Sequence, residues 1–250
     1  ELREKFNRFL AASRANGVYD EIYQRWCVDD PEKAQMPEPN YSANSVELKL
    51  AVAVADLPYV AYLNGRYVGF DIELLQKFAE SEGYKMKTTT MEFSSLIAAM
   101  ASGKADIIAD GIAITEERQK QVAFSDPYMD FKTAAIALKT NIEVTPNTGK
   151  LEKLDDIANK SVGVYAGTIH DTFVEEHYPN ADIQRFNSPA DIILSLKTGK
   201  TDAVFFDLVS AKVILKSNPD IGILSEDALT LPVAAGFNKN NAKLRHEFNK

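Results

Sequence analysis

Residues 105–128 of the chain read ADIIADGIAITEERQKQVAFSDPY. The apolar run near the start of this stretch is typical of a buried strand, which ends at Asp110-Gly111. A short loop then leads through Thr115 to a charged helical turn that contains Arg118. The stretch therefore predicts a strand, a loop and a helix in succession, with polar side chains placed directly after the end of the strand.

The same alternation continues on both sides of this stretch. Short β-rich runs predict strands at 48–54, 85–91, 106–110, 161–165, 182–185 and 202–206. Helical patterns predict helices at 71–82, 94–102, 152–159, 168–177, 188–198 and 208–217. Such alternation is typical of βαβ units, so we expect an α/β fold with two mixed, mainly parallel sheets and flanking helices. Ligands of such folds lie beyond the carboxyl ends of the strands, near helix N-termini.

Two further strands indicate that the chain crosses between two lobes. The run 133–139 has no helix after it and leads into a loop with Asn and Pro, and the run 229–237 is suited to the return. Two crossings predict a two-strand hinge and a cleft between the lobes. We expect lobe 1 to comprise residues 47–138 and 231–250, and lobe 2 to comprise residues 139–230.

The two ends of the chain carry a short repeat. Residues 1–8 read ELREKFNR and residues 243–250 read KLRHEFNK. We interpret this as a tandem array cut out of phase, in which residues 1–27 form a helical hairpin and the Pro- and Asn-rich residues 28–46 form a linker. The linker spans at most about 60 Å when extended. This length lets the hairpin pack on its own chain, and exchange of this tail with a neighbouring chain is the alternative.

The composition excludes several classes of protein. Among 250 residues, 36 are acidic and 28 are basic, and the resulting net charge of −8 argues against a nucleic-acid partner. No apolar run approaches the roughly 20 residues of a membrane span. A single cysteine, Cys27, excludes an internal disulfide and a thiolate-rich metal site.

No metal or other cofactor is expected either. The three histidines are far apart or two turns apart, so we expect them at the surface rather than in a metal site: His170, His177 and His246. The glycine-containing run 162–168 lacks the lysine of a phosphate-binding loop.

Several motifs, taken together, resemble the extracytoplasmic solute-binding proteins of polar amino-acid ABC importers. Besides residues 105–128, the matching segments are GRYVGFDIELLQKFA at 65–79, SVGVYAGT at 161–168 and TDAVFFD at 201–207. The segment RANGVYDEIYQRW at 14–26 resembles the C-terminal helices of the same family, so the likeness covers nearly the whole chain in permuted order. It implies a type 2 periplasmic-binding-protein fold, the Venus flytrap, that closes on a small zwitterion, most simply an amino acid.

The resemblance implies that two charged residues bind the two ends of the ligand. Arg118 would hold the α-carboxylate, for which the planar guanidinium offers two parallel donors. Asp207 would receive the α-ammonium. Each residue also has a plain structural interpretation: Arg118 in an ion pair with a neighbouring glutamate, and Asp207 as the cap of a helix.

The other implied contacts come from the loops and from helix starts. Gly111 and Ala113 would offer backbone groups, and Thr168 and Ile169 would offer the N–H groups of a helix N-terminus. Phe93 and Tyr165 are candidates for the wall of the side-chain pocket, with core packing as the alternative.

The sequence departs from the family pattern at three of these positions. Ala113 stands where the family usually has a hydroxyl residue. Asp56 stands near a position at which an apolar or aromatic residue commonly packs on the ligand, and Asp110 stands where small or polar residues are frequent. These two acids would favour a cationic ligand side chain, or they are solvated acids of a loop.

The resemblance leaves three functions open. The first is delivery of an amino acid to the membrane permease of an ABC importer, at the periplasmic or extracellular face. The sequence starts at Glu1 without Met or a signal peptide, so we expect a processed or excised form. The second is a sensory flytrap fused to a receptor kinase or cyclase. The third is a dehydratase acting on prephenate or arogenate, which needs a carboxylic acid placed to protonate a leaving hydroxyl. No such acid is assigned, so we expect a binding protein without catalytic residues.

Overall fold

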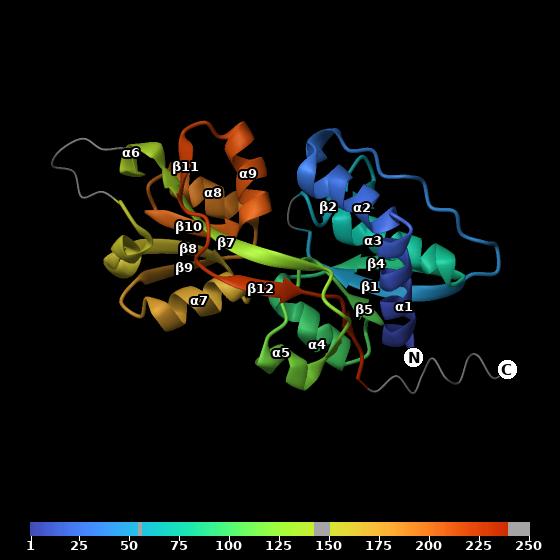
Figure 1. The fold of residues 1–250 in the computed structure, drawn as a ribbon. Coiled ribbons are helices and arrows are strands. Elements are labelled where there is room, and N and C mark those ends of the chain that lie inside the picture. The colour runs from blue at the N-terminus through green and yellow to red at the C-terminus, as the bar shows by residue number, and fades with distance from the viewer. Residues whose placement is uncertain (55–56, 143–150, 240–250) are drawn as a thin grey trace. The chain divides into compact units, whose positions relative to one another are not determined.

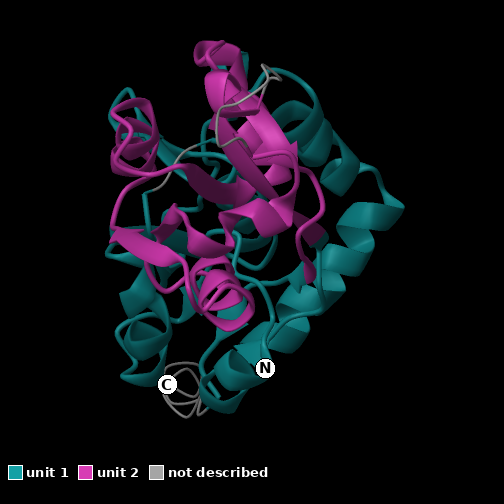
Figure 2. Ribbon diagram, turned by 90° about the vertical axis from the view of Figure 1, so that its left-hand side faces the viewer, with its two compact units in different colours: residues 1–129, 232–250 teal, residues 130–231 magenta. Residues whose placement is uncertain are grey.

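The computed structural model describes residues 1–54, 57–142 and 151–239 (Figure 1). The chain forms two compact units, Glu1–Met129 with Pro232–Lys250, and Asp130–Leu231 (Figure 2). Each unit contains a mixed β-sheet with flanking helices, so the expected α/β fold class is confirmed.

Unit 1 contains a five-stranded sheet in the order β4-β1-β5-β13-β6. Strands β4 and β5 run parallel to β1, and β13 runs antiparallel to β5 and β6. The carboxyl ends of β4, β1 and β5 therefore lie at one edge. The strands are β1 (Val46–Val52), β4 (Tyr84–Thr90), β5 (Ile107–Ile108), β6 (Ala123–Phe124) and β13 (Gly236–Phe237). The helices of its body are α3 (Phe70–Ser81), the short η3 (Phe93–Ser95), α4 (Leu96–Ala101) and α5 (Glu116–Gln121), with a small hairpin of β2 (Ala61–Leu63) and β3 (Arg66–Val68).

Unit 2 contains a sheet in the order β11-β7-β10-β8-β9, with β12 paired to β7. Strands β8, β9 and β10 are mutually parallel, whereas β7 is antiparallel to β10 and β11. The strands are β7 (Met129–Leu138), β8 (Ser161–Tyr165), β9 (Asp182–Phe186), β10 (Ala203–Asp207), β11 (Ile221–Ser225) and β12 (Thr230–Val233). The helices are α6 (Lys139–Ile142), η4 (Leu154–Asn159), α7 (Ile169–His177), α8 (Pro189–Lys197) and α9 (Leu208–Ser217).

The core of unit 2 follows from the alternation of side chains along its central strand. In β10, Phe205 belongs to the apolar cluster on one face of the sheet, and Val204 and Phe206 belong to the cluster on the other face. Burial on both faces explains why the sequence of this strand is a continuous apolar run.

The division between the units falls at Met129/Asp130 and Leu231/Pro232, where the sequence predicted 138/139 and 230/231. The first position differs because β7 pairs with β10 and β11 of unit 2 at residues 133–138. Strand β7 is followed by the single helical turn α6, which the sequence analysis did not predict. The β2–β3 hairpin and β11 were also not predicted.

Residues 1–28 form a helical hairpin that packs on unit 1 of the same chain. It comprises α1 (Leu2–Ala15), α2 (Val18–Tyr23) and the π-helical turn η1 (Gln24–Val28), with Gly17 at a φ of 84° between the first two helices. The ring of Phe6 is fully buried and lies 5.2 Å from the ring of Phe78 and 5.6 Å from that of Phe237, between ring centroids. The second copy of the terminal repeat, residues 243–250, lies outside the described residues.

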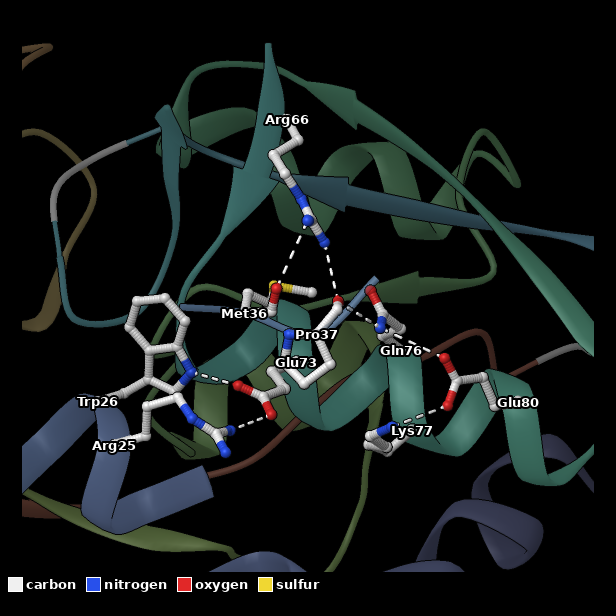
Figure 3. A network of polar contacts seen from close by, with 9 residues as sticks. All are labelled: Arg25, Trp26, Met36, Pro37, Arg66, Glu73, Gln76, Lys77 and Glu80. Carbon is white, nitrogen blue, oxygen red and sulfur yellow. Dashed lines mark hydrogen bonds and ion pairs between the residues drawn. The ribbon is translucent and has the colours of Figure 1, made fainter. Parts of the chain in front are cut away.

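A polar network fastens the end of the hairpin to α3 (Figure 3). The carboxylate of Glu73 is buried and accepts hydrogen bonds from Arg25 and from the indole nitrogen of Trp26. The carbonyl of Pro37 accepts from Arg66 at 2.9 Å and from Gln76 at 3.1 Å. Both the hairpin and the linker are thereby fixed to the body of unit 1.

Candidate functional site

Arg118 lies on the short helix α5 and is oriented by its own loop. The hydroxyl of Thr115 caps this helix by accepting a hydrogen bond from the backbone N–H of Arg118 at 3.2 Å. The guanidinium Nη1 donates to the carbonyl of Ala113 at 2.9 Å, and the guanidinium carbon lies 5.6 Å from the centroid of the Phe93 ring. The structure thus brings three of the predicted site residues together.

The electrostatic setting of Arg118 suits an anion. Removal of the guanidinium from water lowers its pKa to about 10, against a smaller opposing effect of Glu117. The group therefore carries a full positive charge at neutral pH. A partly desolvated guanidinium with a planar array of donors is suited to binding a carboxylate.

Asp110 and Gly111 form a tight turn after β5. Both are buried, with φ values of 150° and 57°, a backbone region that residues with a side chain rarely adopt. The N–H of Gly111 donates to the carboxylate of Asp71 at 2.7 Å. This N–H of Gly111 and the carbonyl of Ala113 thus have partners within the protein, and these contacts hold the loop that carries Arg118.

The remaining predicted residues of unit 1 also follow strand ends. Phe93 comes shortly after β4, and Asp110 comes shortly after β5, which with β4 flanks β1. Asp56 comes after β1 but lies outside the described residues. The parallel pairing of the three strands therefore places Phe93 and Asp110 at the same edge of the sheet.

In unit 2, Asp207 is the last residue of β10 and the cap of α9. Its carboxylate oxygen Oδ1 accepts a hydrogen bond from the backbone N–H of Ser210 at 2.9 Å, and its side chain is buried. The predicted capping role is therefore present. Thr133, a buried residue of β7, stands opposite Asp207 in the strand register.

Tyr165, Thr168 and Ile169 lie at the carboxyl end of β8, the strand beside β10. The hydroxyl and the N–H of Thr168 both donate to the carbonyl of Tyr165, at 2.7 and 3.2 Å. Ile169 begins α7, where the first backbone N–H groups have no acceptor within the helix. These residues and Asp207 share one edge of the unit 2 sheet.

Sequence reasoning missed several buried polar residues near these positions. Asp71 and Tyr128 in unit 1 are 1% and 2% exposed, and Tyr128 donates to Asp71 at 2.7 Å. Asp71 lies in a segment that matched the family, but an acid in the first turn of a helix is typical of solvated helix starts, so its burial was not predicted. In unit 2, the sequence around Thr133 predicted only an apolar strand and gave no indication of a buried polar site.

The expected surface placement of the histidines is wrong for His170. This residue is 8% exposed because the first turn of α7, from Ile169 to Asp171, is buried. His177 is exposed and stacks on the ring of Phe173, and His246 lies outside the described residues. Among the described residues, no group of three or more His, Cys, Asp or Glu is placed to hold a metal ion.

The fold has two α/β units, each with polar groups at the carboxyl ends of its strands, where ligands bind in folds of this kind. The chain belongs to the bacterial extracellular solute-binding proteins, family 3, whose model matches residues 48–250. The expected family, its type 2 periplasmic-binding-protein fold and a binding rather than an enzymatic role are thereby confirmed.

Relatives with arginine in their names are similar to the chain over most of its length. The arginine-binding extracellular protein ArtP of Bacillus subtilis is 31% identical over 218 residues, which cover 84% of this chain and 82% of ArtP. The ABC transporter arginine-binding protein 1 of Escherichia coli is 30% identical over 163 residues, 65% of this chain and 63% of that protein. The arginine-bound form of a truncated ArgBP from T. maritima has a TM-score of 0.71 and 32% identity, covering 81% of this chain and 93% of that one.

The described residues contain no helix that is both long and apolar enough to cross a membrane.

Proposed function

We propose that the protein binds a free amino acid through its two charged backbone groups and delivers it to an ABC importer. The observation that carries this proposal is the half-buried guanidinium of Arg118, oriented by the Ala113 carbonyl and the Phe93 ring. A fixed fork of donors that is partly withdrawn from water gains much by binding a carboxylate. This supports Arg118 as the residue that binds the α-carboxylate.

Asp207 is the proposed partner of the α-ammonium. Its Oδ1 caps α9, and a carboxylate has further lone pairs with which to accept donors from an ammonium group. Because a buried charge is costly without a counter-charge, a ligand that brings both charges stabilises both protein groups. We propose that Arg118 and Asp207 bind the same ligand molecule, with Gly111, Ala113, Thr168 and Ile169 shaping the loops around it.

A cationic side chain is the preferred ligand side chain. Asp110 is buried at the end of β5, and a cation brought beside it compensates the loss of its water. The relatives named above bind arginine according to their names. Phe93 and Tyr165 would supply flat apolar contacts for the aliphatic part of the same side chain, and Asp56 a second acid. Arginine is therefore our first candidate.

A structure of an ancestral arginine-binding protein bound to glutamine, with a TM-score of 0.71 and 32% identity to this chain, makes glutamine the informative competitor. Calorimetric titrations of the full chain with L-arginine, L-lysine, L-histidine and L-glutamine would rank the side chains. Agmatine, which lacks the carboxylate, and Nα-acetylarginine, which lacks the ammonium charge, test the two ends separately. We expect saturable binding of L-arginine and none of the two analogues; equal binding of agmatine and arginine would refute the proposed recognition.

Delivery to a permease at the extracytoplasmic face is proposed from family membership. Reconstitution with the permease of an amino-acid ABC importer from the same organism, followed by measurement of ligand-dependent ATP hydrolysis, tests it. If the ligand does not stimulate ATP hydrolysis, fusion to a receptor kinase or cyclase is the favoured alternative.

Exchange of the tail with a neighbouring chain is a separate proposal, which sedimentation tests. A dimer in dilute solution favours exchange, and a monomer favours the packing within one chain described above.

A further inference from the structure

Asp71 is held rigidly at the start of α3. The preceding Gly69 has a φ of 126°, and a Cβ atom there would lie 2.2 Å from the carbonyl oxygen of Tyr59. Only glycine lets the chain pass this close. The N–H of Asp71 then donates to that same carbonyl at 3.2 Å. The contact with the Tyr59 carbonyl therefore fixes the backbone of Asp71, and the side chain of Asp71 is buried within unit 1.

The carboxylate of Asp71 receives donors from two other segments. Its Oδ2 accepts the N–H of Gly111 at 2.7 Å, and its Oδ1 accepts the hydroxyl of Tyr128 at 2.7 Å. The N–H of Asp110 also hydrogen-bonds to it. One buried carboxylate thus fixes two consecutive N–H groups of a turn whose φ values, 150° and 57°, are unusual.

Tyr128 connects this carboxylate to the leading hairpin. Its backbone carbonyl accepts the hydroxyl of Tyr19, from α2, and the guanidinium of Arg14, from α1, the latter at 3.1 Å. The backbone N–H of Tyr128 donates a hydrogen bond to the carbonyl oxygen of Val233 at 2.9 Å. A continuous series of hydrogen bonds therefore runs from the hairpin through Tyr128 and Asp71 to the turn at Asp110.

We propose that Asp71 is a positioning residue for the ligand-binding turn Asp110–Gly111 and that the hairpin supports this turn through Tyr128. The inference deepens the proposed function and rests on it for the identity of the ligand. A carboxylate that accepts several N–H groups keeps a turn in a conformation that it would otherwise leave. Asp71 touches no ligand itself in this proposal and acts only through the turn.

The test compares Asp71→Asn and Tyr128→Phe with a matched control, Tyr178→Phe, which removes a tyrosine–aspartate hydrogen bond to Asp155 in unit 2. Two quantities are measured on the full chain: the Kd for L-arginine by calorimetry, and hydrogen exchange of the Gly111 amide at a temperature where every variant is folded. We expect both test variants to raise the Kd about tenfold or more and to speed this exchange by a similar factor. The control should change either quantity by less than about twofold.

The hairpin's part is tested by Tyr19→Phe, which should raise the Kd about threefold. An unchanged Kd in this variant overturns the support by the hairpin. Unchanged Kd values in Asp71→Asn and Tyr128→Phe, with only thermal stability lowered, overturn the positioning role. Failure of the wild-type protein to bind any amino acid refutes the proposed function instead, and the exchange of the Gly111 amide then still decides whether Asp71 holds the turn.

Discussion

The indole nitrogen of Trp26 donates a hydrogen bond of 2.6 Å to the carboxylate of Glu73, a residue 47 positions further along the chain. Glu73 also pairs with Arg25 and is 1% exposed. The contact joins the end of the leading hairpin to the helix α3, on which Asp71 lies two residues earlier. The hairpin is therefore part of unit 1 and not an appendage to it.

Glu73→Gln should lower the free energy of unfolding by about 2 kcal/mol, because it leaves Arg25 without its counter-charge at a mostly buried position. The amide oxygen still accepts from Trp26, so the loss reports on the charge. The matched control is Glu175→Gln, whose pair with Arg185 is exposed, at 67% and 43% of the side chains. It should lose less than about 1 kcal/mol. Urea titration measures both, and equal losses would show that the pair of Glu73 is effectively solvated.

Phe6→Ala should lower the free energy of unfolding by about 3–5 kcal/mol, because it removes a fully buried ring from between Phe78 and Phe237. Phe9, on the same helix, is only half-buried, so Phe9→Ala is the matched control and should lose about half as much or less. Denaturation followed by fluorescence of the single tryptophan reports directly on the hairpin. A loss below that of the control would mean that α1 is not anchored as described.

Arg118→Lys should weaken ligand binding about tenfold or more, because a lysine ammonium cannot reproduce two parallel hydrogen bonds to a carboxylate. Thermal stability should change little, since the side chain is only half-buried. Calorimetry with L-arginine measures the effect, and Lys120→Arg on the exposed face of α5 serves as the control. Wild-type affinity in Arg118→Lys would mean that this guanidinium does not bind the carboxylate.

Asp207→Asn separates the capping role from the ligand role. Asparagine caps helices about as well as aspartate, so the melting temperature should stay close to that of the wild type. The charge is lost, so the affinity for an α-ammonium ligand should fall about tenfold or more. Asp207→Ala should lose in addition about 1 kcal/mol of stability. Wild-type affinity in the asparagine variant would mean that Asp207 caps the helix but does not bind the ligand.

The stability of the protein should depend on pH through Asp71. Burial raises the pKa of Asp71 to about 6 from 3.8, against smaller lowering effects of Tyr128 and of the N–H groups of Gly111 and Asp110. Between pH of about 4 and 6 the folded state therefore binds more protons at this site than the unfolded state does, and stability contributed by the protonated group is lost as the pH rises. The total loss is about 3 kcal/mol.

The measurement is the difference in the free energy of unfolding between the wild type and Asp71→Asn at several values of pH. The contributions of the other acidic residues to the pH dependence are the same in both proteins and cancel in this difference. We expect the wild type to lose stability relative to the variant as the pH rises from 4 to 7. A difference that stays constant would show that the pKa of Asp71 is the same in the folded and the unfolded protein. A change in the opposite direction would show that folding lowers this pKa.

Much of the fold was predictable because its elements have local signals. Apolar runs and helical periodicity predicted strands at 161–165 and 202–206 and helices at 71–82 and 208–217. All four elements are present, at 161–165, 203–207, 70–81 and 208–217. The expected ligand-binding roles of Arg118 and Asp207 came from the resemblance to the family of solute-binding proteins. The structure adds the contacts of Arg118 with Ala113 and Phe93, which join loops that follow different strands.

The sequence by itself determined the order of most strands and helices, the α/β fold class and the family. Only the tertiary structure decided that Asp71 meets Gly111, 40 positions away, and that Trp26 meets Glu73. The physical reason is that hydrophobic periodicity indicates which side of a helix or strand is buried, but it does not indicate which other segment that side packs against. Partners far apart in the chain are set by how the sheet and its helices assemble, and the support of the proposed binding turn depends on such partners.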